Sequence, residues 1–227
     1  MIRLHKGPPP DILVQKAAEW TREYKDALAA NTMTETIRYR YRHADIKAAL
    51  RRDSHNKCIY CESDIATGET DHIHPVSKCP DEIVEWANLA LVCKECNGNK
   101  KDYYASAEPL INPFIDEPSE HFEFLGPLVV EVLGDALGLR TRKQIQLNRP
   151  DLLQKRAKRL ERLLPLIEQW RLHPEGSTKN ILRNAIFSEA ADAMDYAATV
   201  RALLKQMLGW DYPPTDSLPD TAVATSG

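Results

Sequence analysis

Residues 57–62 read KCIYCE and residues 92–97 read VCKECN, so two cysteine pairs share one spacing. Each pair can present two thiolates from one tight turn, and two such turns complete a tetrahedral Zn²⁺ site. A site closed by four thiolates leaves no position for a substrate and is therefore structural. The predicted zinc ligands are Cys58, Cys61, Cys93 and Cys96.

The two pairs lie farther apart than in a compact zinc ribbon, so the metal is expected to hold the segment between them and to stabilise its fold. Four buried cysteines without a metal, or a dithiol redox pair, are the alternatives. A redox motif needs only one such pair, however, and this chain has two. The fifth cysteine, Cys79, is interpreted as an ordinary free thiol.

The composition is that of a globular protein with one domain or two modest ones. The chain has 227 residues, of which 43% are hydrophobic, so it can bury a core. Its net charge of −3 excludes a polycationic protein, and any nucleic-acid surface must be a local patch. No stretch reaches the roughly 18–20 apolar residues that a membrane span needs, and the first residues lack the apolar core of a secretory signal. A cytoplasmic location is expected.

Between the cysteine pairs, residues 69–78 read ETDHIHPVSK. Three assignments compete for His72 and His74: they can complete a catalytic zinc site, they can be structural polar groups, or one can be a general base beside a separate hard cation. The four cysteines already satisfy a zinc ion, so the third assignment has the better chemistry. Histidine titrates near neutral pH, and the carboxylate of Asp71 is a suitable Mg²⁺ ligand. Glu69 is expected to be solvated.

Two asparagines and two lysines follow in the same segment. Asn88 precedes the second cysteine pair, and Asn97 comes directly after its last cysteine, where the metal would hold it rigidly. An asparagine carbonyl oxygen is also a suitable Mg²⁺ ligand. Lys100 and Lys101 come next and are expected to contact phosphate. The order of these residues is a more specific signal than any one of them.

The motifs KCIYCE, ETDHIHPVSK and ANLALVCKECNGNK together resemble the HNH endonuclease family, whose active site is a ββα-metal finger. The resemblance implies that Asp71 and Asn97 ligate a catalytic Mg²⁺ or Mn²⁺ ion and that His72 is the general base that activates water. Asn88 corresponds to the middle asparagine of the pattern and would brace the loop that aims His72. His74 would touch phosphate, assist the metal or only pack. The last position of the motif is asparagine rather than histidine here, a variant familiar in the family.

Further phrases resemble one branch of that family, the PtuB nucleases of the Septu anti-phage systems and of related retron-linked defence operons. They are MIRLHKGPPP, VSKCPDEIVEWANL, PLINPFIDEPSEHFEF and LNRPDLLQKR. The resemblance implies an anti-phage nuclease that hydrolyses DNA and works with a PtuA-type ATPase of ABC-like or OLD-like character. The present sequence has no P-loop, so nucleotide sensing would come from that partner.

Outside this module the chain is predicted to be α+β and mostly helical, with the finger embedded between N-terminal and C-terminal helices. Helices are expected over 11–30, with Asp11 as the N-cap, and over 41–53, 139–147, 150–171 and 178–208. Strands are expected over 121–124 and 128–132, joined by a Gly126-Pro127 turn. The predicted regions are an N-terminal helical region (1–57), the HNH module (58–104), short strands with C-terminal helices (105–210) and a disordered tail (211–227).

Two basic stretches are candidates for contact with the phosphate backbone of DNA. They are residues 38–57 and residues 140–162. In the first, Arg51 and Arg52 are the candidate contacts, and Tyr39 and Tyr41 between the arginines either stack on bases or pack in the core. The alternative for both stretches is a solvated helix face.

Three other classes of function compete with a DNA nuclease partnered by an ATPase, and one of them is an RNA-cleaving toxin, which the choice of substrate would expose. A stand-alone restriction-type HNH nuclease has the same motif without the partner. A non-catalytic zinc-finger module that binds nucleic acid explains the cysteines equally well, but it gives no reason for Asp71, His72 and Asn97 to occur together. Plasmid nicking with Mg²⁺ or Mn²⁺, and EDTA as the control, separates an enzyme from a binding module.

Overall fold

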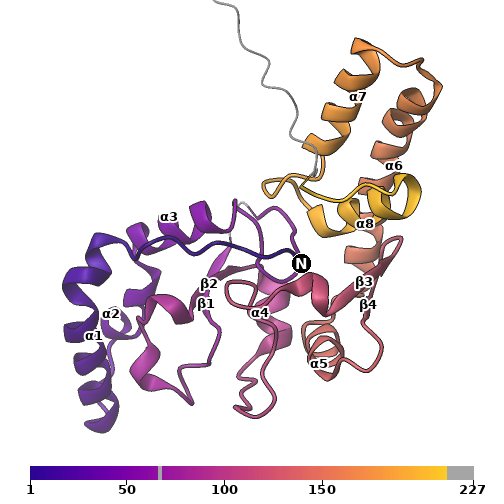
Figure 1. Cartoon of the computed structure of the whole chain (residues 1–227). Helices are drawn as coiled ribbons and strands as arrows, with labels where there is room; N and C mark the ends of the chain where they lie inside the picture. Colours follow the sequence, from indigo (N-terminus) through magenta and orange to yellow (C-terminus); the bar gives the residue numbers. More distant parts are fainter. Residues whose placement is uncertain (66–67, 214–227) are drawn as a thin grey trace, which may run out of the picture.

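The segment between the cysteine pairs folds as an antiparallel hairpin followed by a helix. The computed structural model describes residues 1–65 and 68–213. Strand β1 (Glu69–His72) pairs with β2 (Leu89–Val92), and helix α4 (Lys94–Lys100) follows at once (Figure 1). All β2 side chains are buried, whereas only every second side chain of β1 is buried, ending with His72. The side chains of Asp71 and His72, at the end of β1, therefore project from opposite faces of the hairpin.

Three helices precede the finger, and the first and third of them pack against the hairpin. They are α1 (Asp11–Ala29), α2 (Glu35–Arg38) and α3 (Ala44–Asp53). The buried residues of this cluster are Leu13, Ile46, Ala49, Leu50, Ile83, Val84, Trp86, Leu89 and Leu91. The predicted N-cap is wrong by one residue, because Pro10 holds the extended conformation before α1 and Asp11 is already helical. The helix predicted over 41–53 begins at Ala44, because residues 40–42 form a separate 3-10 turn.

A second hairpin and a helix follow the finger. They are β3 (Phe122–Leu125), β4 (Leu128–Glu131) and α5 (Ala136–Ile145). Both predicted strands are confirmed, and β3 pairs antiparallel with β4. The turn between them needs Gly126, whose φ of +58° lies in the left-handed region that other residues adopt at a cost. Asp135 caps α5 by accepting a hydrogen bond from the Gly138 amide at 2.7 Å.

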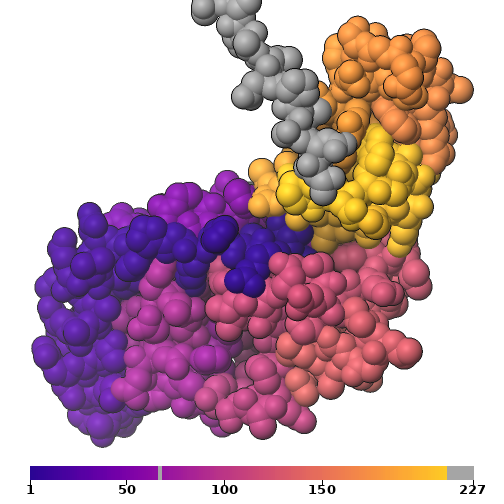
Figure 2. Space-filling model, in the orientation of Figure 1, coloured from indigo at the N-terminus to yellow at the C-terminus, as the bar shows by residue number. Residues whose placement is uncertain are grey.

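The last three helices form an arm that projects from the broad lobe made by the rest of the chain, as Figure 2 shows. They are α6 (Pro150–Leu172), α7 (Ser177–Ser188) and α8 (Ala197–Leu208). The single helix predicted over 178–208 is wrong, because the chain leaves α7 after Ser188 and turns back through Tyr196, which has a φ of +54°. This turn brings Leu204 of α8 into one apolar cluster with Leu163 of α6.

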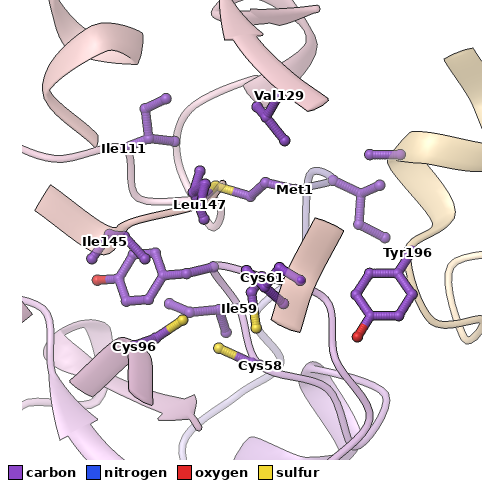
Figure 3. Close-up of a cluster of buried hydrophobic side chains, with 14 of the residues drawn as sticks. Met1, Cys58, Ile59, Cys61, Cys96, Ile111, Val129, Ile145, Leu147 and Tyr196 are labelled. Carbon is purple, nitrogen blue, oxygen red and sulfur yellow. The ribbon is translucent and has the colours of Figure 1, made fainter. Parts of the chain in front are cut away.

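The four cysteines lie in a hydrophobic cluster that joins the finger to the second hairpin and to the arm. Figure 3 shows Met1, Ile111, Val129, Leu147 and Tyr196 gathered around the finger residues. Segments far apart in the sequence therefore meet at the cysteines. The mostly helical α+β fold class, with a small finger built on a four-cysteine cluster, is confirmed.

Three expectations remain as predictions. The tail predicted from residue 211 lies outside the described residues from residue 214 onward. The region boundaries and the cytoplasmic location are not tested by the fold. Among the described helices, none combines the length and the apolar character that a passage through a bilayer requires.

Candidate active site and zinc centre

Four cysteine sulfurs converge beside the hairpin. The Sγ atoms of Cys58, Cys61, Cys93 and Cys96 all lie within 4.8 Å of one another, and all four residues are buried. Figure 3 shows the sulfurs of Cys58, Cys61 and Cys96 pointing toward one another. In a tetrahedral site with Zn–S bonds near 2.3 Å the sulfurs stand about 3.8 Å apart. The Sγ atoms of Cys61 and Cys93 are 3.8 Å apart, so these residues fit a structural Zn²⁺ ion.

The guanidinium of Arg149 completes the surroundings of this cluster. It donates to Cys96 Sγ at 3.5 Å and to Cys93 Sγ at 3.8 Å. Four thiolates around one Zn²⁺ carry a net negative charge, which a neighbouring cation offsets. Arg149 belongs to a basic stretch considered for DNA contact, but its side chain is used here instead. The cysteine spacing gave no sign of this contact, because Arg149 is 53 residues from Cys96 along the chain.

His72 is buried at the end of β1 and is oriented through one ring nitrogen. Its Nε2 lies 2.8 Å from the carbonyl oxygen of Ile83, and a carbonyl only accepts, so Nε2 carries the proton and Nδ1 can take another. The partner of this ring nitrogen is therefore a backbone carbonyl. The ring of Tyr41 packs edge-on against the imidazole at 4.5 Å between centroids. Burial lowers the pKa of His72, and the Ile83 hydrogen bond and the Asp71 carboxylate oppose that shift.

Asn88 ties together the two ends of the loop between β1 and β2. Its Oδ1 accepts from the His74 amide at 2.7 Å, and its Nδ2 donates to the His74 carbonyl at 3.0 Å. The same Nδ2 donates to the Glu82 carbonyl at 3.4 Å, and the Asn88 carbonyl accepts from the Ile73 amide at 2.8 Å. Because Glu82 precedes Ile83, this arrangement fixes the carbonyl that orients His72. The bracing role of Asn88 stays a prediction, which these hydrogen bonds support.

Asp71 forms an ion pair with Lys100 of α4. Lys100 Nζ lies 3.2 Å from Asp71 Oδ2, and the lysine side chain is only 1% exposed. Within the described residues its ammonium has no hydrogen-bond partner, so the carboxylate compensates its charge. Lys100 was expected to contact phosphate, and the structure places it against the carboxylate expected to bind a metal. A positive charge therefore lies beside Asp71 in the protein alone.

Asn97 and Glu69 form a second contact between β1 and α4. The Nδ2 of Asn97 donates to Glu69 Oε2 at 2.7 Å. Glu69 was expected to be solvated, but it is half-buried and serves as an acceptor, because β1 alternation puts it on the same face as Asp71. This hydrogen bond uses the amide nitrogen of Asn97 and leaves its carbonyl oxygen for another partner.

A pocket of about 260 Å³ brings several of these side chains together. Asp71 and His72 line it, along with residues from α1, from the segment before α3, from the β1–β2 loop and from the end of α4. Those residues include Arg38, Tyr39, Tyr41, Ile83, Lys100 and Lys101. Asn88, Asn97, Arg51 and Arg52 are not among its lining residues. Tyr39 and Tyr41, left open between stacking and packing, both face this pocket, and Tyr41 also packs on His72.

Much of the second basic stretch is used inside the protein. Arg156 is buried and donates to the Leu147 carbonyl at 2.7 Å. Arg159 is also buried and forms an ion pair with Glu189 at 2.6 Å. These arginines therefore attach α6 to neighbouring segments. An arginine-rich pattern alone does not distinguish such anchors from a phosphate-binding surface, because both require the same side chain.

The comparison of the sequence with family models agrees with this geometry. Residues 58–103 match the family model described as HNH endonuclease. This segment of the chain is similar to the HNH endonucleases. The matched residues begin at the first zinc-ligand candidate and end just after α4, so they contain the HNH hairpin, the four cysteines and Asp71, His72, Asn88 and Asn97.

Similarity to two curated proteins extends beyond the HNH finger. The chain is 29% identical over 221 residues to Septu protein PtuB of Bacillus thuringiensis, which covers 90% of this chain and 82% of that protein. It is 28% identical over 170 residues to Septu protein PtuB of Bacillus mycoides (strain KBAB4), which covers 59% of this chain and 58% of that protein. The similarity to Septu PtuB therefore extends over most of the chain, beyond the segment that matches the HNH model.

The burial of the HNH histidine predicts the pH dependence of activity. Because the pKa of His72 is lowered, its ring stays neutral below the ordinary value of about 6.5. The acid limb of kcat/KM for nuclease activity is expected below that pH. Tyr41→Ala exposes the ring and is expected to move the limb upward. Tyr39→Ala is the matched control, since Tyr39 lines the same pocket but is paired with Tyr41 rather than with His72.

The same shift predicts the sign of the stability change. A histidine whose folded pKa is depressed stabilises the fold above its unfolded pKa, and this contribution is lost as the pH falls below about 6.5. Chemical denaturation of wild type between pH 7.5 and 5 should therefore show decreasing stability, and Tyr41→Ala should show a smaller pH-dependent part. If the acid limb of Tyr41→Ala lay at the same pH as that of wild type, burial would not be the cause of the lowered pKa of His72.

Proposed function

We propose that this chain is a metal-dependent HNH endonuclease that hydrolyses DNA phosphodiester bonds and is the nuclease effector of an anti-phage defence system acting with an ATPase partner. The observation that carries the proposal is the pocket that holds His72 beside Asp71, with Nε2 of the imidazole committed to the Ile83 carbonyl. This leaves Nδ1 as the proton acceptor. A module that only binds nucleic acid has no use for an imidazole oriented in this way.

Two ions fit the donor sets. The four sulfurs suit Zn²⁺ in a closed structural site. The carboxylate of Asp71 and the amide oxygen of Asn97 are hard donors of the type that Mg²⁺ or Mn²⁺ takes, and Glu69 is a further carboxylate on the same face of β1. When bound, such an ion neutralises charge on the phosphate and on the leaving oxygen. The position of Asn97 outside the pocket lining makes Asp71 the better supported ligand.

The chain's own residues supply the proton transfer. His72 accepts a proton at Nδ1 from a water molecule as the water oxygen forms a bond to phosphorus, and the bond from phosphorus to the 3′ oxygen breaks. The leaving 3′ oxygen takes a proton from solvent, so the products are a 5′-phosphate and a 3′-hydroxyl. Ile83 and Asn88 hold the imidazole in place throughout. His74 lies outside the lining of the pocket and is not assigned a step.

Lys100 is proposed to occupy the cation position beside Asp71 until a metal binds. Breaking a buried ion pair costs about 3–5 kcal/mol. Lys100→Met is expected to lower the free energy of unfolding of the metal-free protein by an amount near the lower end of this range, because methionine fills the space of the lysine stem. Mg²⁺ should then raise the melting temperature of Lys100→Met more than that of wild type. Lys101→Met is the matched control, and an equal Mg²⁺ effect on all three proteins would refute the idea.

Lys101 and Arg38 are proposed to hold the DNA backbone, because both are basic residues that line the pocket containing His72. Each phosphate contact that is removed should reduce the slope of log K against log salt by about one. Lys101→Ala and Arg38→Ala are expected to reduce the slope, and Arg52→Ala, whose side chain lies outside the pocket lining, is expected to leave it unchanged. If only Arg52→Ala reduced the slope, the DNA-binding surface would lie on α3 and not at the pocket.

The ATPase partner is proposed from the similarity to Septu PtuB and from the absence of a P-loop in this sequence. The proposal as a whole is tested by plasmid nicking with Mg²⁺ or Mn²⁺, with and without a co-expressed PtuA-type ATPase, and with EDTA as the control. Cleavage that needs the divalent ion supports the nuclease. Co-purification with the ATPase separates a defence effector from a stand-alone HNH enzyme, and cleavage of RNA alone would replace the proposed substrate.

A further inference from the structure

Three metal-binding side chains gather in the loop between β1 and β2, away from the four-cysteine cluster. One ligand atom from each of His74, Cys79 and Glu82 lies within 4.8 Å of the other two. His74 Nδ1 is 2.9 Å from Glu82 Oε2. The side chains of His74 and Glu82 are 50% and 35% exposed, so an ion can reach them from solvent.

The backbone that carries these side chains is fixed independently of any ion. Asn88 holds both the amide and the carbonyl of His74. The Cys79 amide donates to the Pro75 carbonyl at 3.0 Å, and the Glu82 amide donates to the Cys79 carbonyl at 3.0 Å. Because the three ligands start from a rigid turn, only side-chain torsions need to adjust on binding, which favours a specific site over three unrelated surface groups.

We propose that His74, Cys79 and Glu82 form a second, exchangeable site for a transition-metal ion of the Zn²⁺ type. A thiolate, an imidazole and a carboxylate are the donors that zinc takes, and three protein ligands leave a fourth position for water. The thiolate selects against Mg²⁺ and Ca²⁺, which prefer oxygen. Unlike the buried four-cysteine site, this site is open and solvent-exposed, so its ion exchanges. The proposal does not depend on nuclease activity.

Occupation of this second site has a local structural consequence. His74 follows the end of β1, and Glu82 directly precedes Ile83, whose carbonyl orients His72. An ion bound by His74 and Glu82 therefore links the start of the loop to its middle through side chains, in parallel with the hydrogen bonds that Asn88 makes to the same two residues. The second site stiffens the support of the His72 imidazole when it is filled.

The test uses the full-length protein with its four-cysteine site loaded with zinc. Alkylation of Cys79 by iodoacetamide is followed by mass spectrometry at a series of buffered free Zn²⁺ concentrations. Zn²⁺ is expected to protect Cys79, and Mg²⁺ at the same concentrations is not. His74→Ala and Glu82→Gln should each raise the Zn²⁺ concentration that gives half protection by at least about tenfold, the smallest effect usual even for groups that only support a ligand.

Asp81→Asn is the matched control, because Asp81 is a carboxylate of the same loop that pairs with Lys25 and lies outside the cluster. This variant should keep the wild-type protection curve. Circular dichroism checks that each variant is folded. Alkylation that Zn²⁺ leaves unchanged in wild type overturns the proposal, and so does protection that is equal in wild type, His74→Ala and Glu82→Gln. If the protein showed no nuclease activity but Zn²⁺ still protected Cys79, the proposed function would fail and the second metal site would be supported.

Discussion

His72→Ala is expected to lower the rate of metal-dependent plasmid cleavage by about 10²–10⁴-fold, the usual contribution of a general base. The reason is geometric: His72 lies in the pocket with Asp71, and its Nε2 is committed to the Ile83 carbonyl, so only Nδ1 can take the proton of water. The measurement is the initial nicking rate under saturating divalent ion. KM for DNA should change far less than kcat, because the imidazole acts on the attacking water.

A matched control separates lost chemistry from lost folding. His121→Ala removes another partly buried histidine that is hydrogen-bonded to a carboxylate, that of Asp135, and lies far from the hairpin in the sequence. It should nick plasmid at nearly the wild-type rate. Added imidazole should restore part of the activity of His72→Ala and should not affect His121→Ala. If His72→Ala cleaved DNA as fast as wild type, the assignment of the base would fail.

Cys58→Ser is expected to unfold the finger and thereby to abolish activity. Zinc contributes about 10–16 kcal/mol to the folding of small zinc modules, which equals or exceeds the whole stability of a typical domain. The effect should spread beyond the finger, because the cysteines belong to the cluster that also holds the second hairpin and the start of α8. The measurements are zinc content after dialysis against a mild chelator and the thermal unfolding curve.

Cys79→Ser provides the comparison for that variant. Cys79 lies outside the four-cysteine cluster, so the dialysed protein should keep one zinc per chain and unfold at nearly the wild-type temperature. Retention of zinc and of the wild-type unfolding curve by Cys58→Ser would exclude the structural site. If Cys79→Ser lost both its zinc and its wild-type unfolding curve, Cys79 would be a ligand of the structural zinc, which its position outside the cluster contradicts.

The local part of the site was predictable because its ligands come from short, regular pieces of chain. The two cysteine pairs specify their own turns, and the position of His72 at the end of β1 follows from alternation and from the motif. Helix α4 follows from the same motif, since Cys93 is its N-cap and the Cys93 Sγ accepts a hydrogen bond from the Cys96 amide. In each case the residues that interact are close in the sequence.

The remaining features depend on contacts between distant segments. Arg149 reaches the sulfurs from the start of α6, and Lys100 turned out to neutralise Asp71 rather than to face solvent. The break before α8 arises because Tyr196 must leave the helix to contact the finger. Its amide donates to the Glu62 carbonyl, and its hydroxyl lies 2.9 Å from Ser63 Oγ. Helical periodicity cannot report such a competing tertiary contact.

That contact between Tyr196 and the residues after Cys61 makes the arm mechanically continuous with the finger. Glu62 also accepts a hydrogen bond from the Ala198 amide, the second residue of α8. A force applied to α7 or α8 is therefore transmitted to the turn that supplies two of the four clustered cysteine sulfurs. Movement of the arm and the position of the β1–β2 hairpin are coupled through this turn.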